Sequence, residues 1–200
     1  MSKNVGDELD FIVVNVEHVD SSYDESKDEF ILKERRRAIK TKASLPSFTV
    51  EPKSLEEIDI PDWLLVNIKN EDFLIYDSGK DDKERFFIFG PKNKLIQNNH
   101  VFCDGTFKVA PKLFLQMYTF HKLVEGCPVP VLFTLLPRKN QLIYERMLKA
   151  IKDNLELFPK SFNSDFKKAF LNAVKNIFPN YILYGCYFHF RKCMRSKIQE

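Results

Sequence analysis

The chain has 200 residues, of which 44% are hydrophobic, and its 31 basic and 28 acidic side chains give a formal net charge of +3. This length fits one domain plus a tail, and the near balance of charge gives only a weak general attraction to nucleic acid. The four scattered cysteines exclude a disulfide scaffold, and we find no secretory signal and no apolar run of about 20 residues, so we expect a soluble, intracellular protein without a membrane partner.

Residues 1–59 are expected to form a charged and disordered tail. An acidic stretch precedes the basic run KERRRAIKTK at residues 33–42. Such runs are more often solvated surface, but this one could also be a nuclear-import signal or an arm that contacts phosphates. We expect a nuclear protein. FIVVNV at residues 11–16 is either a short strand or a sticky segment.

Residues 60–200 carry the periodic apolar pattern of a folded domain. IPDWLLVNIKN, residues 60–70, predicts a short helix with Pro61 in its first turn. FLIYDSG and RFFIFG predict two strands at residues 73–79 and 85–90, and residues 91–100 are a connector or a short helix.

Three consecutive strands are predicted next, followed by alternating helices and strands. The strands cover residues 101–109, 112–124 and 129–137, with a turn at EGCP between the last two. A helix over residues 140–155, capped by Asn140, a strand at 161–166, a helix over 166–178, a strand at 181–190 and the start of a helix at 191–200 complete the pattern. The order β-β-β-α-β-α-β-α predicts an α/β fold with a mixed sheet.

Asp104, in VFCDGTFKV, has two interpretations. Asp-Gly between alternating apolar residues is typical of a hairpin turn. A second turn signal directly after Val109 instead favours a continuous strand over residues 101–109. Asp104 would then lie inside a strand, where a carboxylate is costly unless a partner such as a metal ion compensates it.

Asp165 also has two interpretations. Taken alone, Ser164 or Asp165 is a good N-cap for the helix that follows. Asp165 also follows a strand, and in α/β sheets functional groups gather at strand ends, so Asp165 could meet Asp104 there. Two carboxylates could hold the Mg²⁺ ions of two-metal phosphoryl transfer, although a third acid normally completes such a site.

Cys186 and His189 form a C-x-x-H pair in GCYFHF. The spacing can place both side chains on a zinc ion, with Cys193 as a third ligand. Zinc would need a fourth ligand, and buried thiols beside a hydrogen-bonded histidine explain the residues equally well.

Five segments carry a resemblance to a known family: FLIYDSG, RFFIFG, DGTFKVAPKLFLQMYTFH, PVPVLFTLLPRKNQLIYERML and SDFKKAFLNAVKNIFPNYILYGCYFHF. Through these segments, residues 60–200 resemble the Mutator-like element (MULE) transposase domain. This family belongs to the DDE transposases, so the resemblance implies a ribonuclease H-like fold and Mg²⁺- or Mn²⁺-dependent cleavage and transfer of DNA strands. Asp104 and Asp165 look like the first two catalytic, metal-binding acids, and Cys186 and His189 like the family's C-x-x-H element.

The resemblance also implies what to expect of function. In similar proteins the third acid lies well downstream of the C-x-x-H element, and Glu200 is too close to it to match. We therefore expect a fragment of a MULE-type transposase that is inactive alone, with transposon ends and target DNA as partners and a homo-oligomeric state. Weaker candidates for DNA phosphate contact are Lys108, Lys112, Arg138 and Lys139. The alternative is a non-catalytic, transposase-derived protein that binds DNA or other proteins.

Overall fold

The computed structural model describes residues 12–14, 51–67, 69–92, 100–106, 109–156 and 159–199. The chain divides into two compact units: Met1–Asn15 together with Ser54–Glu200, and Val16–Lys53. The first unit thus resumes at Ser54, slightly before the predicted boundary at residue 60. The basic run at 33–42, and most of the tail in which we expected disorder, lie outside the described residues.

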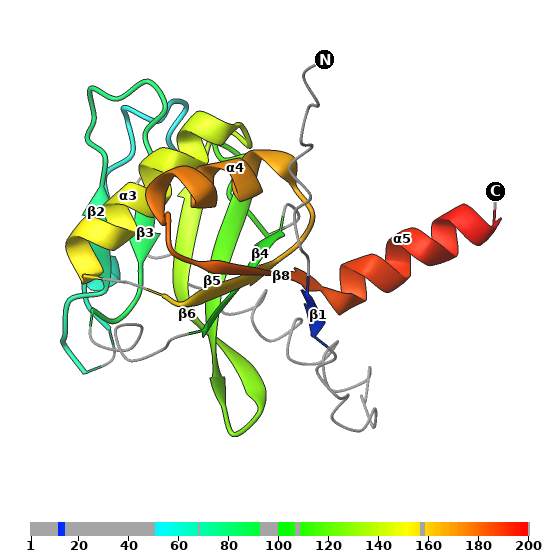
Figure 1. The fold of residues 1–200 in the computed structure, drawn as a ribbon. Coiled ribbons are helices and arrows are strands. Elements are labelled where there is room, and N and C mark those ends of the chain that lie inside the picture. Colours follow the sequence, from blue (N-terminus) through cyan, green and yellow to red (C-terminus); the bar gives the residue numbers. More distant parts are fainter. Residues whose placement is uncertain are drawn as a thin grey trace, which may run out of the picture. The chain divides into compact units, whose positions relative to one another are not determined.

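The first unit is built on one eight-stranded mixed sheet with the order β1-β8-β7-β4-β5-β6-β3-β2 (Figure 1). The strands are β1 (Ile12–Val14), β2 (Leu74–Asp77), β3 (Phe87–Phe89), β4 (His100–Thr106), β5 (Gln116–Val124), β6 (Cys127–Leu136), β7 (Ser161–Ser164) and β8 (Ile182–Cys186). The helices are α2 (Asp62–Leu65), α3 (Gln141–Leu155), α4 (Lys168–Ile177) and α5 (Tyr187–Gln199).

From β4 onward the element order is the predicted one, β-β-β-α-β-α-β-α. Strands β4, β5 and β6 pair antiparallel because short links join them. Glu125 and Gly126, between β5 and β6, both have positive φ, as a two-residue hairpin turn requires. Helical connections then make β7 parallel to β4 and β8 parallel to β7. The predicted α/β mixed sheet is confirmed.

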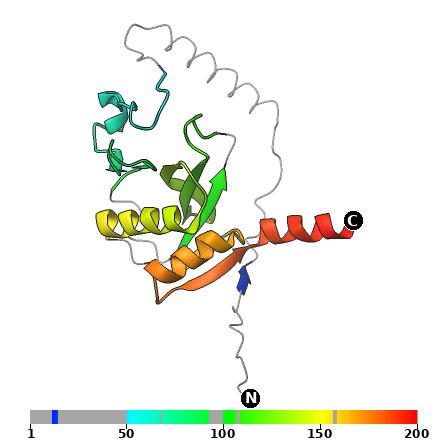
Figure 2. The ribbon, with the colours of Figure 1, turned by 90° about the horizontal axis from the view of Figure 1, so that it is seen from above.

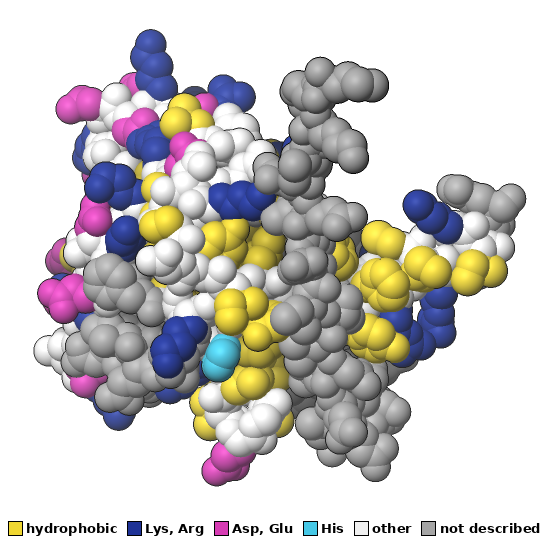
Figure 3. All heavy atoms as spheres, in the orientation of Figure 1, with side chains coloured by type: hydrophobic (Ala, Val, Ile, Leu, Met, Phe, Trp, Pro, Cys, Tyr) yellow, Lys and Arg dark blue, Asp and Glu magenta, His cyan; other side chains and the backbone are white. Residues whose placement is uncertain are grey.

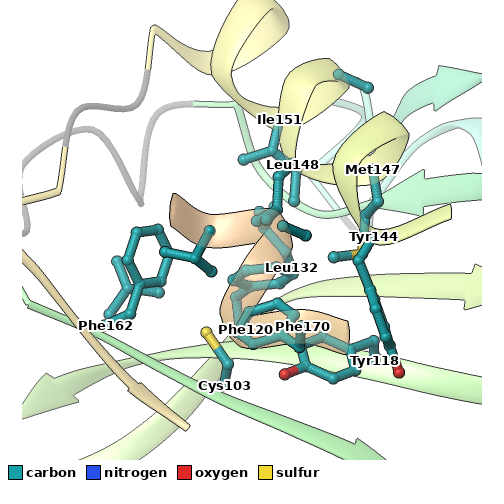
Figure 4. Packing of buried hydrophobic residues seen from close by; sticks show 14 of the residues in the cluster. Cys103, Tyr118, Phe120, Leu132, Tyr144, Met147, Leu148, Ile151, Phe162 and Phe170 are labelled. Atoms are coloured by element: carbon teal, nitrogen blue, oxygen red, sulfur yellow. The ribbon is translucent and has the colours of Figure 1, made fainter. Parts of the chain in front are cut away.

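Helices α3 and α4 lie side by side over one face of the sheet (Figures 1 and 2). The side chain of Asn140 accepts a hydrogen bond from the Ile143 N–H, as predicted for the cap of α3. Between helices and sheet lies an aromatic core in which the Tyr118 ring stacks on Phe170 at 4.8 Å between centroids and contacts Tyr144 (Figure 4). These contacts join β5 to α3 and α4.

Buried Arg85 fastens the β2–β3 hairpin to the chain that precedes it. Its guanidinium donates to both carboxylate oxygens of Asp77 and to the backbone carbonyls of Leu55 and Ile58. The last two contacts explain why the compact unit begins before residue 60.

Two element boundaries differ from the prediction. The strand expected to reach Phe190 ends at Cys186, and α5 begins at Tyr187, so the C-x-x-H pair spans the junction of a strand and a helix. Phe166, expected to open a helix, precedes α4, which begins at Lys168. Along α5 hydrophobic side chains lie on the surface beside Lys and Arg (Figure 3). No described helix has the length and apolar character needed to cross a bilayer.

Candidate metal centre

Parallel pairing of β4 with β7 brings Asp104 beside Asp165. The register pairs Phe102 with Asn163, and the same offset continued by two residues pairs Asp104 with Asp165. Because side chains alternate between the faces of a strand, continuing by two keeps both carboxylates on the face of Phe102 and Asn163. The convergence of two acids that are distant in sequence thus follows from strand register.

His189 reaches the same place from the next strand. Ser164 pairs with Gly185, so Asp165 comes level with Cys186, where β8 ends. His189 lies in the first turn of α5, which follows directly. One ligand atom each from Asp104, Asp165 and His189 lie within 4.8 Å of one another. The site therefore sits at the carboxyl ends of parallel strands, where α/β sheets gather functional groups.

Asp104 is held inside the strand and makes no hairpin turn. It pairs with Thr119 across β5, and the Thr119 hydroxyl donates to the Asp104 carbonyl at 3.1 Å. Its side chain accepts a hydrogen bond from the adjacent Gly105 N–H, at 2.9 Å. The continuous-strand interpretation is correct as far as Thr106; residues 107 and 108 lie outside the described residues.

Asp165 is buried and does not cap α4. The residue at the N-cap is Lys167, which makes no side-chain cap hydrogen bond. Asp165 instead accepts a long hydrogen bond from the Lys167 N–H, at 3.4 Å, and forms an ion pair with the Lys167 ammonium, at 3.0 Å. The capping interpretation is therefore wrong, and the carboxylate is directed to a cationic partner.

Lys167 also borders Gly105, the residue after Asp104. A Cβ on Gly105 would lie 3.0 Å from Lys167 Nζ and 3.2 Å from Gln116 Oε1. Gln116 is fully buried and donates to the Arg138 carbonyl and to the Tyr144 hydroxyl. The glycine thus leaves room for a polar cluster beside the two acids, which sequence reasoning missed because its members come from separate elements.

The two carboxylates influence the core behind them. Burial, with the negative charges of Asp165 and Asp104, raises the pKa of the Cys103 thiol well above its ordinary value. Burial likewise raises the pKa of the Tyr118 hydroxyl, and Cys103 and Asp165 contribute to that shift. Two carboxylates against the single Lys167 ammonium leave an excess of negative charge, which a bound cation would reduce.

His189 is the residue whose position the sequence did not predict. It was expected inside a strand, with a zinc ion shared with Cys186 or a hydrogen-bonded imidazole as the two alternatives, whereas it lies on a helix and near the acids. Its Nδ1 atom is buried and has no hydrogen-bond partner among the described residues. The C-x-x-H spacing was a signal for a metal ligand, but not for the partners that His189 meets.

Cys186 belongs to no ligand group of three or more that the described residues form. Its thiol is partly buried, and Cys193 on α5 is exposed. A zinc ion held by Cys186 and His189 stays a prediction.

The predicted phosphate contacts fall at the same edge of the sheet. Lys108 lies outside the described residues. Lys112 precedes β5, and Arg138 and Lys139 follow β6. The start of β5 and the end of β6 lie together, because Gln116 pairs with Leu136, and β4 ends beside them, because Thr106 pairs with Met117. All three side chains are exposed, and Arg138 forms an ion pair with Glu84. Their role in binding DNA stays a prediction.

The donor set fits a divalent cation. Two ligands on one Mg²⁺ are at most about 4.2 Å apart, twice the usual bond length, so groups within 4.8 Å need only a small adjustment. His189 Nδ1 is buried without a hydrogen-bond partner among the described residues, and a bound cation would accept lone pairs from the imidazole and from the two carboxylates.

Residues 100–193 match the family model of the MULE transposase domain. These residues form a MULE transposase domain. The match runs from the first residue of β4 into α5, so the domain includes Asp104, Asp165, Cys186 and His189. Transposase domains act on DNA with a divalent metal ion, and the family implies both for this MULE domain. No curated protein matches the chain.

Proposed function

We propose that the MULE domain is the part of a DDE transposase that holds the catalytic metal through Asp104 and Asp165, and that its fold is ribonuclease H-like. The observation that carries the proposal is the meeting of these two acids, with His189, within 4.8 Å. The strand order β8-β7-β4-β5-β6 supports the fold assignment. Strands β4, β5 and β6 form an antiparallel meander, and β7 and β8 are added parallel to β4 on the side away from β5.

In this mechanism each residue has a distinct task. Asp104 and Asp165 bind and orient the cation, since carboxylate oxygens are the ligands that Mg²⁺ prefers. When bound, the metal supplies Lewis acidity for in-line attack of a hydroxyl on a phosphodiester. Lys167, already 3.0 Å from Asp165, is in position to contact a phosphate oxygen near the acids.

Basic side chains around the site provide the DNA contacts in this proposal. Lys112, Arg138 and Lys139 are exposed at the edge of the sheet where β4 ends. Contacts from Lys and Arg to phosphates make affinity fall as salt rises. We propose transposon-end and target DNA as the substrates, a homo-oligomer as the working form and the nucleus as its location.

We further infer that these 200 residues do not cleave DNA alone. Among the described residues, the group of ligands at the site contains two carboxylates and an imidazole, and no glutamate joins them. Two-metal chemistry normally uses a third acid to hold the second ion. In this proposal the chain binds metal and DNA as a fragment of a transposase and needs a further acid for catalysis.

Metal titration with a carboxylate variant tests the site. Mn²⁺ binding to the full chain is followed by loss of the free-ion electron paramagnetic resonance signal, with Asp104→Asn and Asp165→Asn compared with Asp153→Asn, an exposed acid on α3. We expect the first two changes to abolish tight binding and the third to leave it unchanged. Binding that both site variants retain would contradict the proposal.

DNA assays test the reaction. We expect salt-dependent duplex binding that weakens when Lys112, Arg138 and Lys139 are changed together to Gln, and no nicking of supercoiled plasmid with Mg²⁺. Nicking that Asp104→Asn abolishes would contradict the inference of inactivity and support the enzyme. Duplex binding that neither Mg²⁺ nor the Asp104 change affects would favour the non-catalytic binding protein.

A further inference from the structure

His189 stands apart from the rest of α5. Between Tyr187 and Ile198, His189 is partly buried and all the remaining residues of the helix are exposed. Phe188, beside it, is 66% exposed and Ile198 is 77% exposed. The one side chain of α5 that turns inward is therefore the one that meets Asp104 and Asp165.

The contacts that the imidazole makes with the described part of the chain do not explain its position. Nδ1 is buried and unpartnered among the described residues, and the ring lies edge-on to exposed Phe188, with 5.5 Å between the centroids. A buried ring nitrogen normally has a hydrogen-bond partner or a metal. Two carboxylates whose oxygens lie within 4.8 Å of a ring nitrogen mark the place where a metal would satisfy all three groups.

We propose that His189 is the third protein ligand of the cation that Asp104 and Asp165 hold. This inference rests on the proposed function, because it concerns the same cation, and it adds a nitrogen donor to the site. The α5 helix would then be tied to the sheet through the metal, since His189 is its only inward-facing residue between Tyr187 and Ile198.

A nitrogen ligand changes which ion the site prefers. Mg²⁺ takes oxygen ligands almost exclusively, whereas imidazole suits transition metals. With two carboxylates and one imidazole, the site should bind Mn²⁺ and Co²⁺ more tightly than Mg²⁺. It should also hold one such ion without the third acid of the family, because three protein ligands are already present.

The direct test is to detect the nitrogen on the bound metal. Mn²⁺ bound to the full chain is examined by electron spin echo envelope modulation, which reports a coordinated ¹⁴N nucleus. We expect nitrogen modulation in the wild type and none in His189→Ala. We also expect His189→Ala to weaken Mn²⁺ binding by about tenfold or more, since loss of even an outer partner of a ligand costs about 10–100-fold.

Two further variants keep the test decisive. His189→Gln keeps a polar side chain of similar reach and should retain the fold, checked by circular dichroism, while losing the nitrogen signal. His100→Ala is the control, because His100 lies at the start of β4, the strand that carries Asp104, and its Nδ1 is 2.6 Å from Ser161 Oγ, away from the acids. It should leave both the modulation and the affinity unchanged.

The possible results separate the inference from the function it rests on. Nitrogen modulation that persists in both His189 variants, or is missing from the wild-type complex, would overturn the role of His189 while leaving Asp104-dependent binding intact. Mn²⁺ binding insensitive to Asp104→Asn would overturn the proposed function itself. A Co²⁺ complex with a thiolate absorption band that Cys186→Ser removes would assign His189 to a Cys186 site and overturn the inference.

Discussion

Lys167 forms an ion pair with Asp165, the carboxylate that we propose as a metal ligand. Its ammonium lies 3.0 Å from the Asp165 carboxylate, and the pair is shielded because only 29% and 10% of the two side chains are exposed. Like charges repel more strongly at such partly buried positions than in water. A divalent cation therefore has to bind against this resident positive charge.

Lys167→Met should consequently strengthen metal binding in the absence of DNA. We expect Mn²⁺ affinity to rise roughly 3–10-fold at low salt, because a nearby positive charge is removed. Isothermal titration calorimetry measures this, with Lys149→Met as the control, since Lys149 pairs with Asp153 on the exposed surface of α3. Weaker binding in Lys167→Met than in the control would mean that the lysine helps to form the site.

Cys103 lies directly behind the acids, and its chemistry should reflect them. Burial and the charges of Asp165 and Asp104 raise the pKa of its thiol, so the thiolate is scarce even above the ordinary cysteine value of about 8.5. Near this ordinary value, the Cys103 thiol should therefore be alkylated in the unfolded chain and not in the folded one. Because the folded state favours the neutral thiol, the free energy of unfolding should fall as the pH rises above the ordinary value.

The expected outcome is selective alkylation. With iodoacetamide at about pH 8.5, Cys127 and Cys193, which are exposed, should react, while Cys103 stays unmodified until the protein is unfolded in urea. Peptide mass spectrometry identifies the modified sites. Rapid modification of Cys103 in the folded chain would contradict the burial and the charge environment described here.

At the scale of elements, Gly185 on β8 determines where Phe166 lies. A Cβ on Gly185 would come within 2.7 Å of two atoms of the Phe166 ring, too close for any real contact. Phe166 follows Asp165 directly and is 38% exposed, so its ring can move outward. Such a movement would shift the backbone that carries Asp165.

Gly185→Ala should therefore harm the metal site more than the fold. We expect a loss of about 1 kcal/mol in the free energy of unfolding, together with a several-fold loss of Mn²⁺ affinity. Asn140→Ala is the comparison, because it removes the α3 cap at a similar cost of about 1 kcal/mol and leaves the acids untouched. Equal Mn²⁺ affinity in the two variants, measured beside urea unfolding, would rule out this coupling.

Elements with local signals were predictable from the sequence. The Asn140 cap and the apolar spacing define α3. The β-α-β order favours parallel strands, but the pairing of β7 with β4, and the register that unites Asp104 and Asp165, come from the structure. The aromatic run at residues 187–190 has strong strand propensity, which is why α5 was expected to begin later than it does. Lys167, Gln116 and His189 could not be placed, because their neighbours come from distant elements and only folding brings them together.

At the scale of the whole molecule, stability should differ between the core and α5. Helices α3 and α4 bury apolar faces against the sheet, whereas α5 buries little beyond part of His189. Isolated helices of this length are marginal in water. Amide hydrogen exchange in the metal-free chain should thus be slow in α3 and α4 and fast along α5.

Binding of Mn²⁺ should change this pattern in one place. If His189 coordinates the ion, the first turn of α5 becomes linked to β4 and β7 through Asp104 and Asp165, and opening of that turn must break a metal bond. Exchange measured by mass spectrometry should then slow by about tenfold or more in peptides that cover the start of α5, in line with stabilisation by a ligand in excess over its dissociation constant. The α5 C-terminal half should be unaffected, and His189→Ala should remove the protection. Protection that spreads evenly over α5, or survives in His189→Ala, would show that the metal does not act on the helix through this histidine.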